Sequence, residues 1–168
     1  GDDVSLWPGN LIAGGEDTII SVGARQAIAF PQAASLLDQV SDELQTQPGS
    51  EENLVLAGEL ELLLGNFCAA KPHLLDALAL PMSPDRRRRT EILLRELLYR
   101  QLKNGHGNEP TILKQLDRLA KSPAQRGRYL IQRAEFQLRD ENFYGVLDST
   151  REFAALDLRE PLPIAGNE

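Results

Sequence analysis

From residue 31 onward, apolar side chains recur every three or four positions, which is the spacing of one face of an α-helix. Proline, glycine or asparagine interrupts this pattern at intervals. Pro48 and Gly49 end one helical segment, and Ser50 is placed to cap the next; Ser83 and Pro84 stand in the order of a cap and a first helical residue. The pattern predicts helices over about 32–46, 51–64, 67–80, 84–103, 110–121, 124–140 and 143–157.

The first thirty residues follow a different pattern. Short apolar runs at 10–13, 18–22 and 26–30 are separated by the turn-forming residues 14–17 and 23–25, which predicts a small antiparallel β-meander. Such a sheet is only marginally stable alone and must pack on something. We therefore expect a β-meander over 1–30, a helical domain over 31–158, and a proline-containing linker or disordered tail over 159–168.

Two expectations concern burial. In the first helix, one face is expected to carry Ala34, Leu37, Val40 and Leu44 toward the core. Cys68 is the single cysteine, so the chain can form no internal disulfide. Its apolar, helical surroundings predict that it packs as a small hydrophobic residue.

Composition agrees with a helical fold. Apolar residues make up 42% of the chain but aromatic residues only 5%, a balance that favours helix packing over a β-sandwich. The net charge of −7 argues against binding to nucleic acid or to anionic lipid. No apolar stretch approaches the roughly 20 residues that cross a bilayer, so no membrane insertion is expected. The sequence does not indicate a cellular compartment.

One stretch, LAGELELLLGNFCAAKPHLLDALALP at 56–81, has small residues at the positions where two helices of a hairpin would approach each other. The residues expected to form this packing are Gly58, Gly65, Phe67, Ala70, Leu74 and Ala77. The stretch resembles the tetratricopeptide repeat, in which a small residue lets helix A approach helix B and two alanines of helix B admit the next repeat. It departs from that family at Glu61, where a large aromatic residue is expected, and at Pro81, which comes one residue early.

A weaker copy follows 76 residues later. Ala134 corresponds to Gly58 and Asn142-Phe143 to Asn66-Phe67, while Val146 and Phe153 stand where the alanines belong. The interval leaves room for a third hairpin over about 85–121, which lacks the small-residue signature. The resemblance therefore implies a mainly α fold: a right-handed solenoid of about three αα-hairpins with one leading helix, preceded by the β-meander.

Residues 6–30 also resemble the final strands of a β-propeller of the quinoprotein-like kind. This resemblance implies that the strands are the remnant of an upstream propeller, which they and the helices would contact, and it is compatible with an exported or periplasmic protein. The alternative is a separate β-meander that caps the first helical hairpin.

Candidate chemistry is sparse. Gly9, Gly14 and Gly15 have the glycine spacing of a P-loop, but the lysine and the hydroxyl residue that would hold phosphate and magnesium are missing. His73 and His106 lie far apart in the sequence and belong to no metal-binding motif. We assign no catalytic, cofactor-binding or metal-binding residue and expect no enzyme.

Four consecutive arginines, Arg86 to Arg89, open the fourth predicted helix, where they oppose the helix dipole. Successive helical residues are about 100° apart, so the four cannot form one flat patch. Either they pair with Asp85, with Glu91 or with acids of the preceding hairpin, or they bind a carboxylate or phosphate of a partner.

In the resembled family, helix A of each repeat lines a groove that binds peptides. Carried over by position, the groove residues of this chain are Glu52, Val55, Glu59, Leu62, Leu63, Arg128, Ile131, Glu135, Leu138 and Arg139. This mixture of apolar residues and both charges suits a protein or peptide partner. We therefore expect a non-enzymatic interaction or scaffold module within a larger protein. The alternatives are a structural extension of an upstream propeller, and a ligand-binding or enzymatic domain completed by residues outside this sequence.

Overall fold

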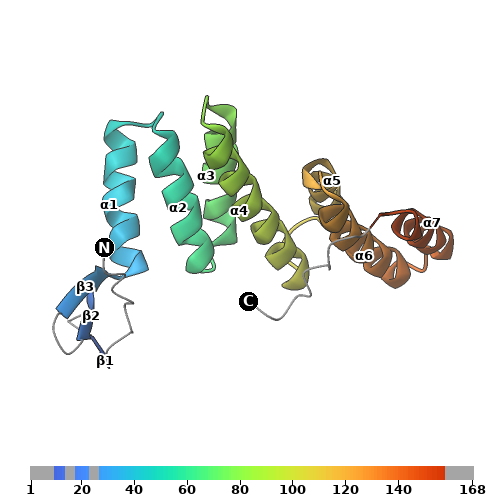
Figure 1. The fold of residues 1–168 in the computed structure, drawn as a ribbon, viewed down its shortest axis with the longest axis horizontal. Helices are drawn as coiled ribbons and strands as arrows, with labels where there is room; N and C mark the ends of the chain where they lie inside the picture. Colours follow the sequence, from blue (N-terminus) through green and yellow to red (C-terminus); the bar gives the residue numbers. More distant parts are fainter. Residues whose placement is uncertain (1–9, 14–17, 23–26, 158–168) are drawn as a thin grey trace, which may run out of the picture. The chain divides into compact units, whose positions relative to one another are not determined.

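The computed structural model describes residues 10–13, 18–22 and 27–157, most of which are helical (Figure 1). The predicted mainly α fold is confirmed, and every helix lies within three residues of its predicted bounds. The predicted tail at 159–168 lies outside the described residues. The helices are α1 (Ala33–Thr46), α2 (Glu51–Leu63), α3 (Phe67–Ala79), α4 (Pro84–Lys103), α5 (Glu109–Leu119), α6 (Pro123–Arg139) and α7 (Phe143–Ala154).

Three strands precede the helices. They are β1 (Asn10–Ala13), β2 (Thr18–Val22) and β3 (Ala27–Pro31), and they pair antiparallel in chain order, with Ile20 opposite both Ile12 and Ala29. This is the strand order of a meander. The resemblance of 6–30 to a propeller stays a prediction, and parts of that stretch lie outside the described residues.

Several helices begin at polar caps that the sequence displays. The side chains of Ser50 and Ser83 accept hydrogen bonds from the backbone N–H groups of Asn53 and Arg86, each at 3.3 Å, as predicted. Ser122 forms a reciprocal capping box with Gln125 at the start of α6. These caps satisfy backbone donors that a helix leaves unpaired, and they explain why the helix boundaries follow the sequence closely.

The chain divides into two compact units, residues 1–94 and residues 95–168, with the boundary inside α4. Within each unit consecutive helices pack against each other, an arrangement consistent with a helical repeat: α1 on α2 and α2 on α3 in the first, α5 on α6 and α6 on α7 in the second. Val40 of α1 and Ala57 and Leu60 of α2 form the buried centre of the first of these contacts.

Two burial expectations are wrong. Ala34 is exposed, because the buried face of α1 is turned so that Ala33 and Leu36 pack beside Val40 instead. Cys68 is also exposed, near the start of α3, although its neighbours in the sequence are apolar. The inward face of α3 is instead formed by other small and apolar residues.

The contact between α2 and α3 depends on Gly58. A β-carbon at this position would lie 2.7 Å from both Cγ and Cδ2 of Leu74 and 3.4 Å from the carbonyl oxygen of Ala70. Ala70, Leu74 and Ala77 are all fully buried. The small residues that the sequence placed at this interface are therefore where the two helices come closest.

Three helix ends share one tight turn. In each, a residue in the left-handed region follows the helix: Gly65 (φ 81°), Gly105 (φ 67°) and Glu141 (φ 56°). The next N–H group then bonds to the carbonyl oxygen five residues back at 2.8 Å, the pattern of a Schellman motif. These bonds join Asn66 to Glu61, His106 to Gln101 and Asn142 to Gln137. The turn thus recurs between α2 and α3, between α4 and α5, and between α6 and α7.

We expect Gly58→Ala to destabilise the protein by about 1 kcal/mol, because overpacking beside the buried Leu74 outweighs the better helix propensity of alanine. Urea unfolding followed by circular dichroism measures this free energy. In a Leu74→Ala background, where the obstructing side chain is gone, the same Gly58→Ala change should stabilise by about 0.5–1 kcal/mol.

The matched control is Gly49→Ala, because a β-carbon at Gly49 has no other atom within 4 Å. Its effect should stay within about 0.5 kcal/mol. Equal effects of the Gly58 and Gly49 changes would contradict the proposed close approach of α2 and α3.

Candidate partner-binding surface

On α2, most of the predicted groove residues are engaged within the chain. Val55 and Leu62 are buried, with 6% and 4% of their surface exposed. Glu52 and Glu59 lie within ion-pair distance of arginines at the start of α4, and of the five predicted positions Leu63 is the apolar one that is exposed. This face of α2 is therefore largely covered by the first half of α4, which belongs to the same unit.

The arginine run explains how α4 is held there. Arg86 pairs with Glu51 at 2.5 Å and Arg89 with Glu59 at 2.6 Å, while Arg87 donates to the carbonyl oxygen of Leu78 at 3.1 Å. For Arg86 and Arg89, the expected pairing with acids of the preceding hairpin is confirmed. Beneath these pairs, Leu93 packs against the apolar cluster of Leu54, Val55 and Ala77.

On α6, two of the predicted groove residues are also engaged. The Arg128 guanidinium lies over the ring of Tyr99, 3.9 Å from its centre, and within 3.9 Å of a Glu96 carboxylate oxygen. Arg139 pairs with Glu109 at 2.6 Å. Both contacts lie inside the second unit and turn these cations away from any groove.

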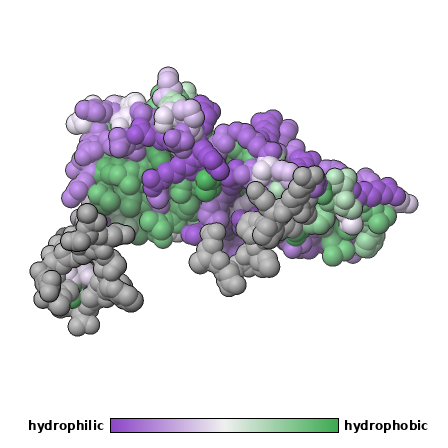
Figure 2. All heavy atoms as spheres, in the orientation of Figure 1, coloured by the Kyte–Doolittle hydropathy of each residue, from purple (hydrophilic) through white to green (hydrophobic). Residues whose placement is uncertain are grey.

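The other three predicted residues of α6 are exposed. Ile131 and Leu138 expose 41% and 56% of their surface, and Glu135 between them accepts a hydrogen bond from Gln132 of its own helix. On α7 the apolar side chains Phe143, Tyr144 and Leu147 are exposed as well. Figure 2 shows apolar surface on this hairpin beside polar surface. We call these six residues, together with the hollow described next, the α6–α7 face.

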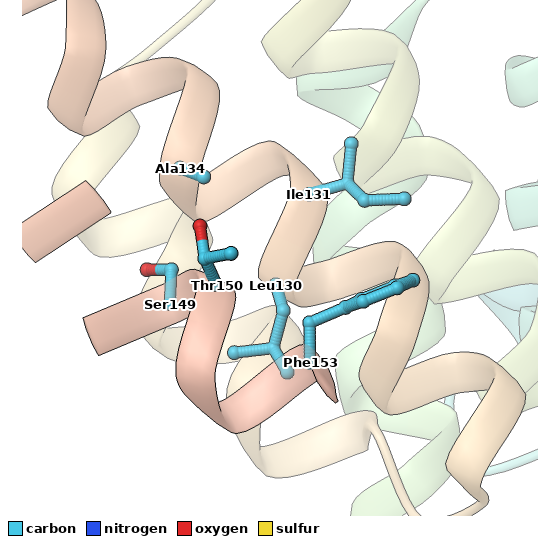
Figure 3. A pocket seen from close by; sticks show the side chains of 6 residues that line it. All are labelled: Leu130, Ile131, Ala134, Ser149, Thr150 and Phe153. Carbon is cyan, nitrogen blue, oxygen red and sulfur yellow. The ribbon is translucent and has the colours of Figure 1, made fainter. Parts of the chain in front are cut away.

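A shallow apolar hollow of about 170 Å³ lies between the two helices. Figure 3 shows side chains of α6 and α7 around it, with Phe153 reaching across beside Leu130. The lining residues are Leu130, Ile131, Ala134, Ser149, Thr150 and Phe153. The hollow is smaller than the roughly 300–1,000 Å³ of typical small-molecule sites, so it suits a side chain of a larger partner.

A polar network beside the hollow joins α7 to α6. Arg133 donates to the Ser149 hydroxyl at 2.8 Å, and that hydroxyl donates to the Gln137 amide oxygen at 2.7 Å. Arg133 also binds one oxygen of Glu152 at 2.6 Å, while Arg126 binds the other at 3.0 Å. These charge-assisted bonds fix the rotation of α7 about its axis.

The arginines of this network also bear on an aromatic ring and on a pKa. Both Arg126 and Arg133 lie over the buried ring of Tyr129, 4.9 Å and 5.7 Å from its centre, and Arg126 also pairs with Asp117 of α5. The hydrogen bond from Arg133 is the main cause that holds the pKa of Glu152 below its ordinary value. Partial burial opposes this shift, and Arg126 adds to it.

The packing residues predicted for the weaker copy are only partly buried: Ala134 is half-buried and Phe143 is 63% exposed. The close approach of α7 to α6 uses different residues. Ser149 is buried, and a β-carbon on Gly145 would lie 2.6 Å from the Gln137 amide nitrogen. Each is one residue away from a small residue of the 56–81 pattern or its four-residue successor, so the buried face of α7 is rotated relative to that of α3.

Sequence reasoning missed the residues that hold this hairpin together. Arg133, Gln137, Ser149 and Glu152 carry no motif, and only their spacing at three or four positions on each helix links them. Glu141 was missed for another reason: the left-handed turn residue is glycine in the first two turns, and here it is a glutamate.

Because the folded-state pKa of Glu152 is lowered, its stabilising contribution is complete above the ordinary glutamate pKa of about 4.3 and is lost as the pH falls through the folded value. We expect Glu152→Gln to lower the free energy of unfolding by up to about 1 kcal/mol at pH 7, since the pair is partly exposed. The difference should shrink toward zero by pH 3. Urea unfolding at both pH values measures it.

Glu135→Gln is the control, because Glu135 lies on the same helix pair and its one hydrogen bond comes from a neutral side chain. It should have little effect at either pH. A Glu152→Gln effect that is equally large at pH 3 and pH 7 would contradict the assigned role of the carboxylate.

Among the described residues, no group of three or more His, Cys, Asp and Glu side chains is arranged to hold a metal ion. Within the same residues, no helix combines the length and apolar character that crossing a bilayer requires. No protein-family model matches this chain, and neither a curated protein nor a solved structure shows significant similarity to it.

Proposed function

We propose that this chain is a non-enzymatic interaction module that binds a protein partner on the α6–α7 face. The observation that carries the proposal is the exposure of Ile131, Leu138, Phe143, Tyr144 and Leu147 on adjacent helices, around an apolar hollow. Scattered apolar residues are normal on a protein surface, but a contiguous set with a hollow at its centre is typical of a binding site.

The make-up of the face favours a protein over a small molecule. Aromatic residues such as Phe143 and Tyr144 supply much of the binding energy at protein interfaces. The hollow is small and open, and it is lined almost wholly by apolar atoms, so it offers few polar groups to orient a metabolite.

The wider architecture that we propose is a tetratricopeptide-like solenoid. Its support is the recurrence of one turn at Gly65, Gly105 and Glu141, and the small residues between α2 and α3. In this proposal the working surface differs from the groove that the resemblance implies. On α2 that groove is largely covered by α4, and on α6 its apolar positions form part of the α6–α7 face.

The test compares the parent chain with Leu138→Glu in affinity capture from a lysate of the organism that encodes it, with quantitative mass spectrometry. We expect at least one protein to be retained by the parent and lost by at least tenfold with Leu138→Glu, since a buried charge without a partner is strongly disfavoured at an interface. Circular dichroism should show equal helix content and melting for both chains.

Leu75→Glu is the matched control, because Leu75 is an exposed leucine on α3, outside this face. It should retain the same proteins as the parent. If the three chains retain the same proteins in equal amounts, the α6–α7 face is not the binding surface.

A further inference from the structure

The two hairpins at the ends of the helical region can be compared position by position. Their turns, at Gly65 and Glu141, have the same hydrogen bonds and lie 76 residues apart. With this offset Val55 corresponds to Ile131, Glu59 to Glu135 and Leu62 to Leu138. On the second helix, Leu74 corresponds to Thr150 and Ala77 to Phe153.

Equivalent positions differ sharply in exposure. Val55 and Leu62 expose 6% and 4% of their surface, whereas Ile131 and Leu138 expose 41% and 56%. Ala77 is fully buried, whereas Phe153 is half-buried and lines the hollow. The difference follows from what lies on each hairpin: on the first, α4 covers these positions, and α7 is the last helix of the described residues.

The way α4 covers the first hairpin defines the chemistry of such an occupant. Arg89 pairs with Glu59 at 2.6 Å, and Leu93, one helical turn later, packs on the cluster that contains Val55 and Ala77. At the last hairpin the acid is kept, as Glu135. The apolar pair is kept as well, as Ile131 and Phe153, and both line the hollow.

We infer that the partner of the α6–α7 face is an amphipathic α-helix that places a basic residue against Glu135 and, four residues later, a large apolar side chain in the hollow beside Ile131 and Phe153. This inference rests on the proposed function and names its partner. The occupant repeats the contact that α4 makes with the first hairpin.

The same comparison sets one restriction. Arg86 of α4 pairs with Glu51 and also lies 3.8 Å from Glu52, but Gly127 and Arg128 stand at the equivalent positions of the last hairpin. A basic residue three positions before the one that meets Glu135 therefore has no acid to meet. The preferred helix has one basic residue at this end of its contact.

The probe is a fluorescent peptide of residues 83–98 of this chain with Arg86→Ala, acetylated and amidated, which carries Arg89 and Leu93 in the required spacing. Fluorescence anisotropy measures its binding to the full chain. We expect saturable binding that falls by about fivefold with Glu135→Lys in the chain, the upper range for an exposed ion pair. A peptide with Leu93→Asp should bind more than about tenfold more weakly, because its apolar contact is lost.

A charge exchange locates the contact. The peptide with Arg89→Glu should bind poorly to the parent and regain affinity for the Glu135→Lys chain. Asp38→Lys, which makes the same change of net charge at an exposed position on α1, is the control and should leave binding of the unaltered peptide unchanged.

Three results would overturn the inference: no binding of the peptide by the parent, binding that Glu135→Lys and Asp38→Lys reduce equally, or a dimer of the chain in sedimentation velocity that Leu138→Glu abolishes, which would make a second copy the occupant. If the peptide fails but cellular proteins are still lost with Leu138→Glu, the proposed function stands and only the helical partner is wrong. If Leu138→Glu loses nothing, the proposed function itself fails.

Discussion

The close approach of α2 and α3 at Gly58 is the constraint on which the first unit depends. With Leu74 lying directly over the glycine, the two helices can pack at one axial position only, because any shift brings a larger residue against the same side chain. That fixed pair then presents Val55, Glu59 and Ala77 on a common surface, where α4 lies. The order of contacts in this unit thus follows from the absence of one side chain.

Electrostatics acts on top of this apolar arrangement. Each pair between α2 and the start of α4 is partly exposed and contributes no more than about 1 kcal/mol. Their value lies in geometry, since Arg86 and Arg89 can meet Glu51 and Glu59 in one register of the two helices. The arginine run, which opposes the dipole of its own helix, is thereby compensated by the acids of the preceding hairpin.

Much of the fold could be predicted from the sequence, because its signals are local. Ser50, Ser83 and the glycine turns mark helix ends by hydrogen bonds that span only a few residues, and the small residues of 56–81 mark the closest helix pair. The face that each helix buries was harder to predict. Ala34 and Cys68 lie one position from residues that pack, and on a helix one position is a rotation of about 100°, which only the neighbouring helix decides.

The candidate site was predictable to the same extent. Position within a repeat correctly placed Ile131, Glu135 and Leu138 on an exposed surface, but it could not show that Val55 and Leu62, at the same repeat positions, are covered. That distinction depends on which helix follows, and this is a property of the array and not of the repeat. The network of Arg133, Gln137, Ser149 and Glu152 was beyond prediction because it joins two helices through individual polar atoms.

The two closely packed hairpins are thus built on different physical terms. Between α2 and α3 the contact is formed by buried apolar atoms, whose interaction barely responds to dissolved ions. Between α6 and α7 it includes guanidinium–carboxylate bonds that are partly open to water, and mobile ions screen such bonds over about 8 Å at physiological ionic strength. Rising salt therefore loosens the hairpin that bears the apolar face before it affects the other, so ionic strength acts on the shape of the binding surface as well as on its charge.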